Sequence, residues 1–224
     1  MKTRTIEIMD TTLRDGEQTS GVSFSSSEKL TLAKLLLEEL QVDRIEVASA
    51  RVSEGELKAV KSIADWAKTE GYLSKVEVLT FVDNGVSLKW MQEAGAKVQN
   101  LLTKGSLNHL THQLKKTPEQ HFDEIENVIS EAQKLGIDTN VYLEDWSNGM
   151  RNSKDYVFQF LDFLTKQPIK RVLLTDTLGV LTHTETGVFL KEIVERYPNT
   201  HFDFHGHNDY DLSVANVMEA LKAG

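Results

Sequence analysis

The stretch His201-Phe202-Asp203-Phe204-His205-Gly206-His207 alternates between polar side chains and aromatic or small residues with a period of two. Successive side chains of a β-strand point to opposite faces, so a strand here has one aromatic face and one face carrying Asp203, His205 and His207. A sheet covered by helices on both sides needs two apolar faces, whereas a barrel can carry catalytic groups on its inner face. The stretch therefore favours a TIM (β/α)8 barrel over an open, doubly wound sheet.

The segment 139–145 alternates in the same way. Its aliphatic face carries Val141 and Leu143, and its polar face carries Asn140, Tyr142 and Glu144. Three further predicted strands contribute a polar residue to the same pattern, and these residues are Glu46, Glu77 and Asn100. A polar inner face shared by several strands is typical of a barrel that houses a site.

Seven short β-branched runs each precede a longer amphipathic segment, which is the pattern of parallel βα units. The predicted strands cover residues 6–10, 44–48, 76–81, 97–103, 139–145, 170–176 and 201–207. A complete barrel has eight strands in typically about 250 residues. We therefore expect residues 1–224 to form a single barrel domain, truncated after the seventh βα unit.

Capping residues mark the start of two helices. Ser25, followed three positions later by Glu28, predicts a capping box, and Thr117-Pro118 predicts a helix that begins with a threonine cap and a proline. The apolar residues expected on the buried face of the first helix are Leu30, Ala33, Leu37 and Leu40.

The composition excludes several classes of protein. The chain has 25 basic and 34 acidic side chains, for a formal charge of −9, and lacks the run of Lys and Arg that nucleic acid or an anionic membrane would require. No apolar stretch approaches the roughly 20 residues that span a bilayer, and no signal-peptide core is visible. The absence of cysteine excludes disulfides, thiolate nucleophiles and cysteine-ligated metals. We expect a cytoplasmic protein that binds neither nucleic acid nor membrane.

A candidate metal site combines three residues. His205 and His207 have the spacing that places two imidazoles on one face of a strand, and Asp15, in the segment that follows the first strand, adds a hard carboxylate. Two histidines and a carboxylate suit a divalent ion that keeps open positions for substrate and water. Arg14 adds a fixed cation beside them. The alternatives are histidines that bond to neighbouring backbone and ordinary salt bridges in a charged loop.

Further groups fall at the carboxyl ends of other strands, the rim where barrel enzymes build their sites. Glu144 faces inward, where a carboxylate shielded from water can move protons, although it can also be a structural carboxylate paired with Arg or Lys. Thr177 can bond a substrate carboxylate or cap the following helix. The strand-end residues expected to form an apolar pocket wall, or only part of the core, are Leu79, Phe81 and Leu102. Together these groups favour proton abstraction next to a carbonyl, with fixed positive charge stabilising the oxyanion.

Three motifs together resemble a known family. They are residues 10–18 (DTTLRDGEQ), 175–179 (TDTLG) and 205–209 (HGHND), the last followed by Asn216. They are similar to the acyl-CoA-dependent synthases of the isopropylmalate, homocitrate and citramalate type, within the DRE-TIM metallolyases, and the resemblance covers essentially the whole chain. The segments 100–106, 142–149 and 207–212 are most similar to the spirochaete-type (R)-citramalate synthases.

The resemblance implies a Claisen condensation of acetyl-CoA with an α-keto acid, followed by hydrolysis of the thioester. The keto acid would chelate a divalent ion (Zn, Mn or Mg) held by Asp15, His205 and His207, with Gln18 supporting the water shell of the ion. It also implies a branched-chain amino-acid pathway, leading to isoleucine or leucine, and a homodimer when the protein is full length. A C-terminal regulatory domain of the family would lie outside this chain.

Roles for individual side chains follow from the same resemblance. Arg14 would polarise the keto oxygen, Glu144 would help to remove the acetyl methyl proton, and Thr177 would hold the keto-acid carboxylate. The full set of residues expected to contact substrate is Arg14, Gln18, Leu79, Phe81, Leu102, Tyr142 and Thr177.

The bulk of Leu79, Leu102 and Tyr142 favours pyruvate, and hence the product (R)-citramalate, over the larger 2-oxoisovalerate. A methylene misfit is worth only about 1–3 kcal/mol, so the preference is modest. The alternatives are a 2-isopropylmalate synthase, a homocitrate synthase and a catalytically inactive fragment. Two further alternatives are a lyase of the hydroxymethylglutaryl-CoA type, against which the segment 142–146 argues, and a biotin-dependent carboxyltransferase, whose metal-bridging lysine is missing from residues 175–177.

Overall fold

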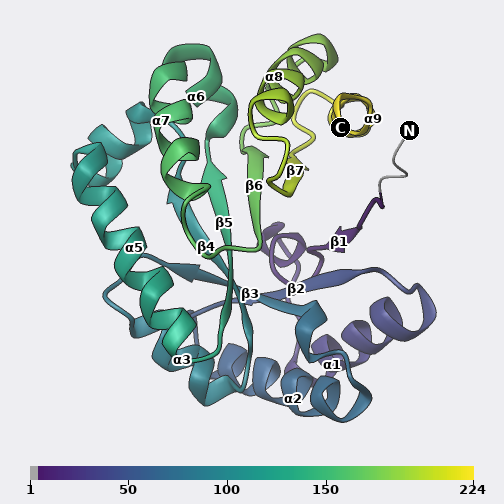
Figure 1. Cartoon of the computed structure of the whole chain (residues 1–224). Helices are drawn as coiled ribbons and strands as arrows, with labels where there is room; N and C mark the ends of the chain where they lie inside the picture. Colours follow the sequence, from purple (N-terminus) through teal and green to yellow (C-terminus); the bar gives the residue numbers. More distant parts are fainter. Residues whose placement is uncertain (1–4) are drawn as a thin grey trace. The chain divides into compact units, whose positions relative to one another are not determined.

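Strands and helices alternate along the computed structural model, which describes residues 5–224 (Figure 1). The strands are β1 (Met9–Asp10), β2 (Arg44–Ser49), β3 (Val76–Phe81), β4 (Val98–Lys104), β5 (Asp138–Glu144), β6 (Arg171–Asp176) and β7 (Phe202–Gly206). The α-helices are α1 (Ser26–Lys34), α2 (Glu54–Glu70), α3 (Val86–Ala94), α4 (Leu107–His109), α5 (Pro118–Lys134), α6 (Trp146–Asn152), α7 (Lys154–Leu164), α8 (His183–Arg196) and α9 (Ser213–Ala223). Short 3-10 or π turns are η1 (Gly16–Gln18), η2 (Leu35–Glu39), η3 (Leu73–Lys75) and η4 (Leu110–Leu114).

The first of two structural units comprises residues 5–100 and 134–138. Its strands β1, β2 and β3 pair in parallel in chain order, with Met9 opposite Arg44 and Ile45 opposite Val76. Helices α1, α2 and α3 lie along one side of these strands (Figure 1), and α2 contacts both β2 and β3. The apolar core of this unit lies between strands and helices and includes the fully buried Ile63 of α2.

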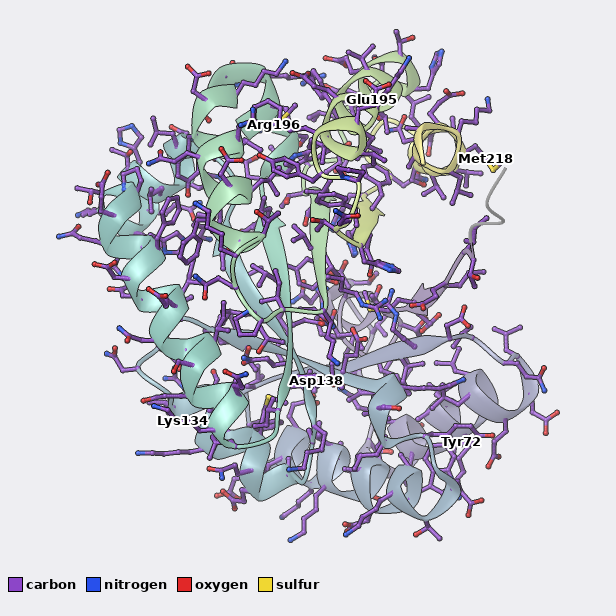
Figure 2. All side chains as sticks on the ribbon, in the orientation of Figure 1. Tyr72, Lys134, Asp138, Glu195, Arg196 and Met218 are labelled. Atoms are coloured by element: carbon purple, nitrogen blue, oxygen red, sulfur yellow. The ribbon has the colours of Figure 1, made fainter. Side chains whose placement is uncertain are left out.

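The second unit comprises residues 101–133 and 139–224. Strands β5, β6 and β7 again pair in parallel in chain order, with Val141 opposite Val172 and Leu174 opposite Phe204. Stacked rings of α5 and α7 fill its core, among them Phe122 of α5 at 5.0 Å from the ring of Phe160. Figure 2 shows that Met218 of α9 projects away from the ribbon of its helix, and its side chain is half exposed.

Within residues 5–224 the observed strands confirm the predicted seven, and for six of them the bounds differ from the prediction by at most one residue. The first strand is the exception, because the expected segment 6–10 forms a strand only at Met9–Asp10. The side chain of Asp43 accepts the N–H of Ile8, while the Ile8 carbonyl accepts the N–H groups of Asp43 and Arg44. The side chain of Ile8 is 62% exposed, so burial does not extend the strand.

Both predicted helix starts are confirmed. Ser25 accepts the N–H of Glu28 and donates its own N–H to that carboxylate, and Thr117 exchanges equivalent bonds with Gln120 ahead of α5.

The buried face predicted for the first helix is only partly correct. Ala33 and Leu37 are buried, but Leu40 is 68% exposed. The N–H of Leu40 bonds to the carbonyl of Leu35, five residues back, because the helix continues as the π turn η2. A π turn takes more residues per revolution than an α-helix, so Leu40 leaves the apolar face.

Polar side chains form a buried layer on the strands of the first unit, as the alternation predicts. Glu46, Glu77 and Asn100 are each at most 1% exposed. Burial raises the pKa of Glu77, although the guanidinium of Arg44 lies 3.2 Å from its carboxylate. Buried charges need partners, and this layer supplies them within the unit.

Candidate functional site

The loop after β1 is a tight turn around one carbonyl group. The N–H groups of Arg14, Asp15 and Gly16 all lie within 3.1 Å of the Thr11 oxygen. The side chain of Asp10 fixes the start of the loop by accepting the backbone N–H of Thr12 at 2.9 Å. These local bonds give the side chains of Arg14 and Asp15 a fixed backbone.

Arg14 is held between two carboxylates. Its Nε lies 2.5 Å from Glu46 Oε2, and one terminal nitrogen lies 3.0 Å from Asp15 Oδ1. The other oxygen of Glu46 accepts from Asn100 Nδ2 at 2.7 Å, so the carboxylate that orients Arg14 is itself oriented. A cation held this rigidly suits stabilisation of negative charge that develops on a substrate.

Neither Glu46 nor Asn100 was expected to belong to the site. The sequence signal that marks them is their position on the polar face of predicted strands, and that pattern by itself indicates a barrel and not a contact with Arg14.

The other expected residues of the first unit lie near the ends of its elements. Gln18 ends η1, is exposed, and donates its N–H to the Asp15 carbonyl at 3.0 Å. Leu79 is 5% exposed in β3, and Phe81 at the end of that strand is half-buried.

His205 and His207 lie together at the end of β7. Their ring centroids are 5.1 Å apart, and the edge of the Tyr142 ring meets the His205 ring at 6.0 Å. The N–H of His207 bonds to the carbonyl of Asp176, which ties this end of β7 to β6. The structure thus brings the two imidazoles together at this end of β7.

The two imidazoles fit a divalent ion by donor chemistry, because each offers a ring nitrogen on the same strand end and both are half-buried. Asp15 belongs to the other unit, and its role as a third ligand of the same ion stays a prediction.

Gly179 brings the loop after β6 against the histidine segment. Its φ is +58°, and a Cβ there would lie 2.7 Å from the backbone nitrogen of Asp209 and 2.9 Å from the carbonyl carbon of His207. Only glycine combines that backbone conformation with that close approach. The TDTLG and HGHND motifs therefore meet in the second unit.

Glu144 ends β5 and forms an ion pair with Lys104 at the end of β4. Its carboxylate is half-buried, and the structure has the Lys partner that the alternative interpretation named. The backbone N–H of Lys104 in turn donates to Nε2 of the buried His121. Burial, together with the charges of Lys116 and Lys104, lowers the pKa of His121 to about 4, so this imidazole stays neutral at physiological pH.

Thr177 lies just after β6, and its Oγ1 accepts the backbone N–H of Asp145 at 2.8 Å. Because one lone pair is engaged this way, the hydroxyl hydrogen can point to an acceptor such as a substrate carboxylate. Thr177 does not cap the following helix, since α8 begins at His183 with Thr182 as its cap.

Asp145 connects three strand ends. Its backbone adopts a left-handed conformation with φ of +63°, and its side chain is 1% exposed. Its carboxylate accepts from Ser106 Oγ at 2.6 Å and from Asn148 Nδ2 at 2.7 Å. Strained backbone of this kind persists where surrounding bonds fix it. The bond to Thr177 extends the connection from β4 and β5 to β6.

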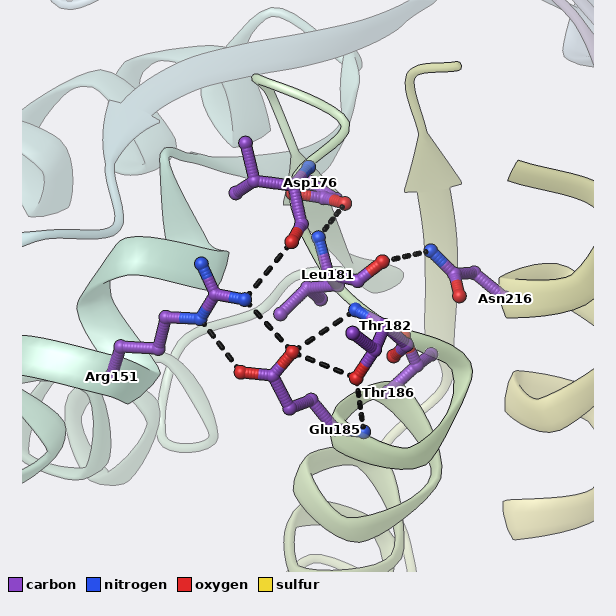
Figure 3. A network of polar contacts seen from close by, with 8 residues as sticks. Arg151, Asp176, Leu181, Thr182, Glu185, Thr186 and Asn216 are labelled. Carbon is purple, nitrogen blue, oxygen red and sulfur yellow. Dashed lines mark hydrogen bonds and ion pairs between the residues drawn. The ribbon is translucent and has the colours of Figure 1, made fainter. Parts of the chain in front are cut away.

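A polar network orders the rest of the loop after β6 (Figure 3). Arg151 of α6 makes two bonds of 2.8 Å to Glu185, and Glu185 closes a capping box with Thr182. Asp176 accepts the N–H of Leu181 at 2.9 Å, and the Leu181 carbonyl accepts from Asn216 of α9 at 2.9 Å. The loop that carries Thr177 is therefore anchored by α6, α8 and α9.

The expected apolar wall is distributed over several strands. Leu102 is half-buried in β4, and Tyr142 is 2% exposed in β5. Within the second unit the ring of Tyr142 lies against that of His205, and Thr177 forms a hydrogen bond with Asp145, the residue that follows Glu144. Lys104, Asp145 and His121 support these residues and were not expected, because their roles depend on contacts between distant parts of the chain.

Among residues 5–224, no helix is both long and apolar enough to cross a membrane.

Comparison with curated proteins finds relatives that are named as synthases. The chain is 31% identical to a 2-isopropylmalate synthase of Oceanobacillus iheyensis, over 98% of the chain and 42% of the relative. It is also 31% identical to a Methanopyrus kandleri protein named "Putative (R)-citramalate synthase CimA", again over 98% of the chain and 42% of the relative. The chain thus spans less than half the length of these relatives.

Comparison with solved structures confirms a TIM-barrel-like fold. The HMG-CoA lyase of Bacillus subtilis superimposes with a TM-score of 0.80 at 21% identity, over 99% of the chain and 75% of the lyase. The carboxyl transferase domain of Rhizobium etli pyruvate carboxylase superimposes with a TM-score of 0.72 at 14% identity, over the whole chain and 39% of that protein. At these identities the likeness concerns the fold alone.

The family pattern named HMGL-like matches residues 5–224, nearly the entire sequence. This match confirms the resemblance that the three motifs carry. The chain belongs to the HMGL-like family.

Proposed function

We propose that this chain carries the catalytic barrel of an enzyme that condenses acetyl-CoA with an α-keto acid, and that pyruvate is its preferred keto acid. The relatives named above support a condensing synthase. The observation that carries the proposal is the junction of the TDTLG and HGHND motifs, where Gly179 lies against His207 and Thr177 follows β6. A keto acid bound there would find a hydroxyl donor beside two imidazoles.

In this proposal His205, His207 and Asp15 would hold a divalent metal ion, and the ion would polarise the keto carbonyl. Thr177 donates its hydroxyl hydrogen to the keto-acid carboxylate while its oxygen accepts from Asp145. Arg14, fixed by Glu46, stabilises the negative charge that forms on the keto oxygen.

Glu144 takes a proton from the acetyl methyl group, and the resulting carbon attacks the keto carbon to form the new C–C bond. The keto oxygen becomes an alkoxide and takes up a proton from solvent, while Glu144 returns its proton to solvent. Water then cleaves the thioester and releases the thiol of coenzyme A. The ion pair with Lys104 keeps the Glu144 carboxylate at the strand end for the first step.

The preference for pyruvate rests on the size of Leu79, Leu102 and Tyr142. Two of these side chains are at most 5% exposed, so they have little room to yield to a larger substrate. The expected discrimination is modest, at about 1–3 kcal/mol per methylene.

The direct test is release of free thiol from acetyl-CoA, measured with pyruvate, 2-oxoisovalerate and 2-oxoglutarate in turn, with Zn²⁺, Mn²⁺ or Mg²⁺ supplied. We expect turnover to be fastest with pyruvate. Faster turnover with 2-oxoisovalerate would assign a 2-isopropylmalate synthase instead. Absence of turnover with every keto acid and metal would refute the condensing activity of this chain.

Thr177→Val tests the substrate contact. Loss of a hydrogen bond to a charged group is worth about 1.5–3 kcal/mol, so KM for the keto acid should rise roughly 10- to 100-fold while KM for acetyl-CoA stays unchanged. Thr177→Ser is the matched control, because it keeps the hydroxyl and should keep KM near the wild-type value. An equal rise in both KM values would assign Thr177 a structural role only.

A further inference from the structure

Lys29 of α1 is a fully buried cation, with only 1% of its side chain exposed. Its Nζ lies 2.6 Å from Glu17 Oε2 and 2.8 Å from Glu56 Oε2. The same nitrogen donates to the carbonyl of Leu13 at 2.9 Å and to that of Val47 at 3.2 Å. A buried ammonium group is costly unless it is paired and hydrogen-bonded, and here two carboxylates and two carbonyls surround it.

The two carbonyls have a specific place in the chain. Leu13 immediately precedes Arg14, and Val47 immediately follows Glu46. Arg14 and Glu46 form the 2.5 Å ion pair of the candidate site. A single ammonium group therefore holds the backbone on both sides of that pair.

The helix that carries Lys29 is well fixed. The Lys29 N–H closes the first turn of α1 by bonding to the carbonyl of Ser25, whose side chain forms the capping box with Glu28. The contact with Glu56, at the start of α2, joins α1 to a neighbouring helix, and α1 and α2 pack against each other. Lys29 thus extends from a rigid helix pair to the loop after β1 and to the middle of β2.

The contact between Lys29 and Glu17 also fixes the loop after β1. Glu17 lies in η1, within the loop that carries Arg14 and Asp15, and its other oxygen accepts the N–H of Phe24. Of the four groups around the ammonium, Glu17 and Leu13 belong to the loop after β1 and Val47 to β2, whereas only Glu56 belongs to the helix pair. Three of the four contacts therefore act on the elements that carry Arg14 and Glu46.

We propose that Lys29 is a positioning residue that sets the geometry of the Arg14–Glu46 pair through the carbonyls of Leu13 and Val47. Its effect on turnover rests on the proposed function of Arg14, whereas its effect on the loop does not. Lys29 touches no substrate in this proposal. Removal of the Lys29 ammonium group should displace the Arg14 guanidinium, although Arg14 itself is still present.

The experiment compares two matched variants, Glu17→Gln and Glu56→Gln. Each removes one carboxylate charge from the same ammonium group, but only Glu17 belongs to the loop that carries Arg14. We expect Glu17→Gln to lower kcat roughly tenfold and to speed hydrogen exchange of the amides in residues 13–18 at least tenfold. Glu56→Gln should keep kcat within about twofold of wild type and keep the exchange of these amides unchanged, while it lowers the melting temperature.

Lys29→Met removes all four contacts and Lys29→Arg retains a cation in the same place. We expect Lys29→Met to lower kcat at least 100-fold, with KM for acetyl-CoA unchanged, and Lys29→Arg to recover a part of the loss. If Lys29→Met does not fold, the comparison of Glu17→Gln with Glu56→Gln tests the positioning role of Lys29. Equal effects of Glu17→Gln and Glu56→Gln on kcat and on loop exchange would overturn the proposal.

The exchange measurement separates this proposal from the proposed function. If the wild-type chain catalyses no condensation, faster exchange of residues 13–18 in Glu17→Gln than in Glu56→Gln still supports the positioning role. Equal exchange in both variants overturns it, whatever the wild-type activity.

Discussion

His121→Gln should make the protein less sensitive to mild acid. His121 has no exposed surface, and burial lowers its pKa from 6.5 to about 4, so the folded protein keeps this imidazole neutral where the unfolded chain protonates it. Between pH 6.5 and 4 the unfolded state therefore binds more protons, and the free energy of unfolding falls as the pH falls. Glutamine has no such titration and retains an acceptor for the Lys104 N–H.

The size of the effect follows from the two pKa values. A shift of 2.5 units corresponds in full to about 3 kcal/mol, since one unit is worth about 1.4 kcal/mol. Between pH 7 and pH 5 the linkage relation gives a loss of about 2 kcal/mol from this one group. For a chain of this size that corresponds to a fall in Tm of roughly 4–8 °C.

The assay is urea or thermal unfolding of wild type and His121→Gln at half-unit steps from pH 7.5 to 4.5. His112→Gln is the matched control, because His112 is exposed on η4 a short distance away in sequence. We expect the wild-type and His112→Gln curves to fall together and the His121→Gln curve to be flatter by about 2 kcal/mol over two pH units. Parallel curves for wild type and His121→Gln would refute the assignment of a neutral, buried imidazole.

Two further substitutions test packing and charge. Gly149→Ala would place a methyl group 2.1 Å from the carbonyl oxygen of Gly105, so we expect urea unfolding to give a free energy of unfolding lower by about 1–3 kcal/mol. Gly55→Ala on α2 should be nearly neutral, because the nearest atom to the new methyl group would be Ser53 Oγ at an ordinary contact distance of 3.4 Å. Hydrogen bonds from Arg151 lower the pKa of Glu185 to about 2, so the stability that this carboxylate contributes is present above pH 4.5 and is lost as the pH falls towards 2. The difference in unfolding free energy between wild type and Glu185→Gln should shrink over that range, and a constant difference would contradict this linkage.

The strands could be predicted because a period of two is a local property of the sequence. Phe204 and His205 occupy opposite faces of β7 in any fold that forms this strand, and the parallel register then places His205 beside Thr175. The position of Leu40 could not be predicted in this way. Its exposure depends on the π turn η2, in which its N–H bonds to the carbonyl of Leu35, and periodicity gives no warning of such a turn.

The candidate site was predictable to the extent that its groups follow strands. Glu144 and His205 could be named because each lies at the carboxyl end of a strand, and Arg14 because it lies in the loop that follows the first strand. Lys29 and Lys104 could not, since composition marks lysine as a surface residue and each becomes informative only through a partner 12 or more positions away in the chain. Contacts between residues that are distant in the sequence arise only in the packed structure, and they produce no periodic pattern in the sequence.

The bonds of Asp145 also matter for protein engineering. Asp145 follows β5 and joins Ser106 after β4 to Thr177 after β6. The loops after β4, β5 and β6 therefore form one module for exchange between proteins. Transplanting the loop after β5 alone into another barrel would leave a buried carboxylate and a strained backbone without the hydroxyl groups that hold them. Loop grafts intended to change substrate range in this family should therefore carry residues 104–106, 144–148 and 177–182 together.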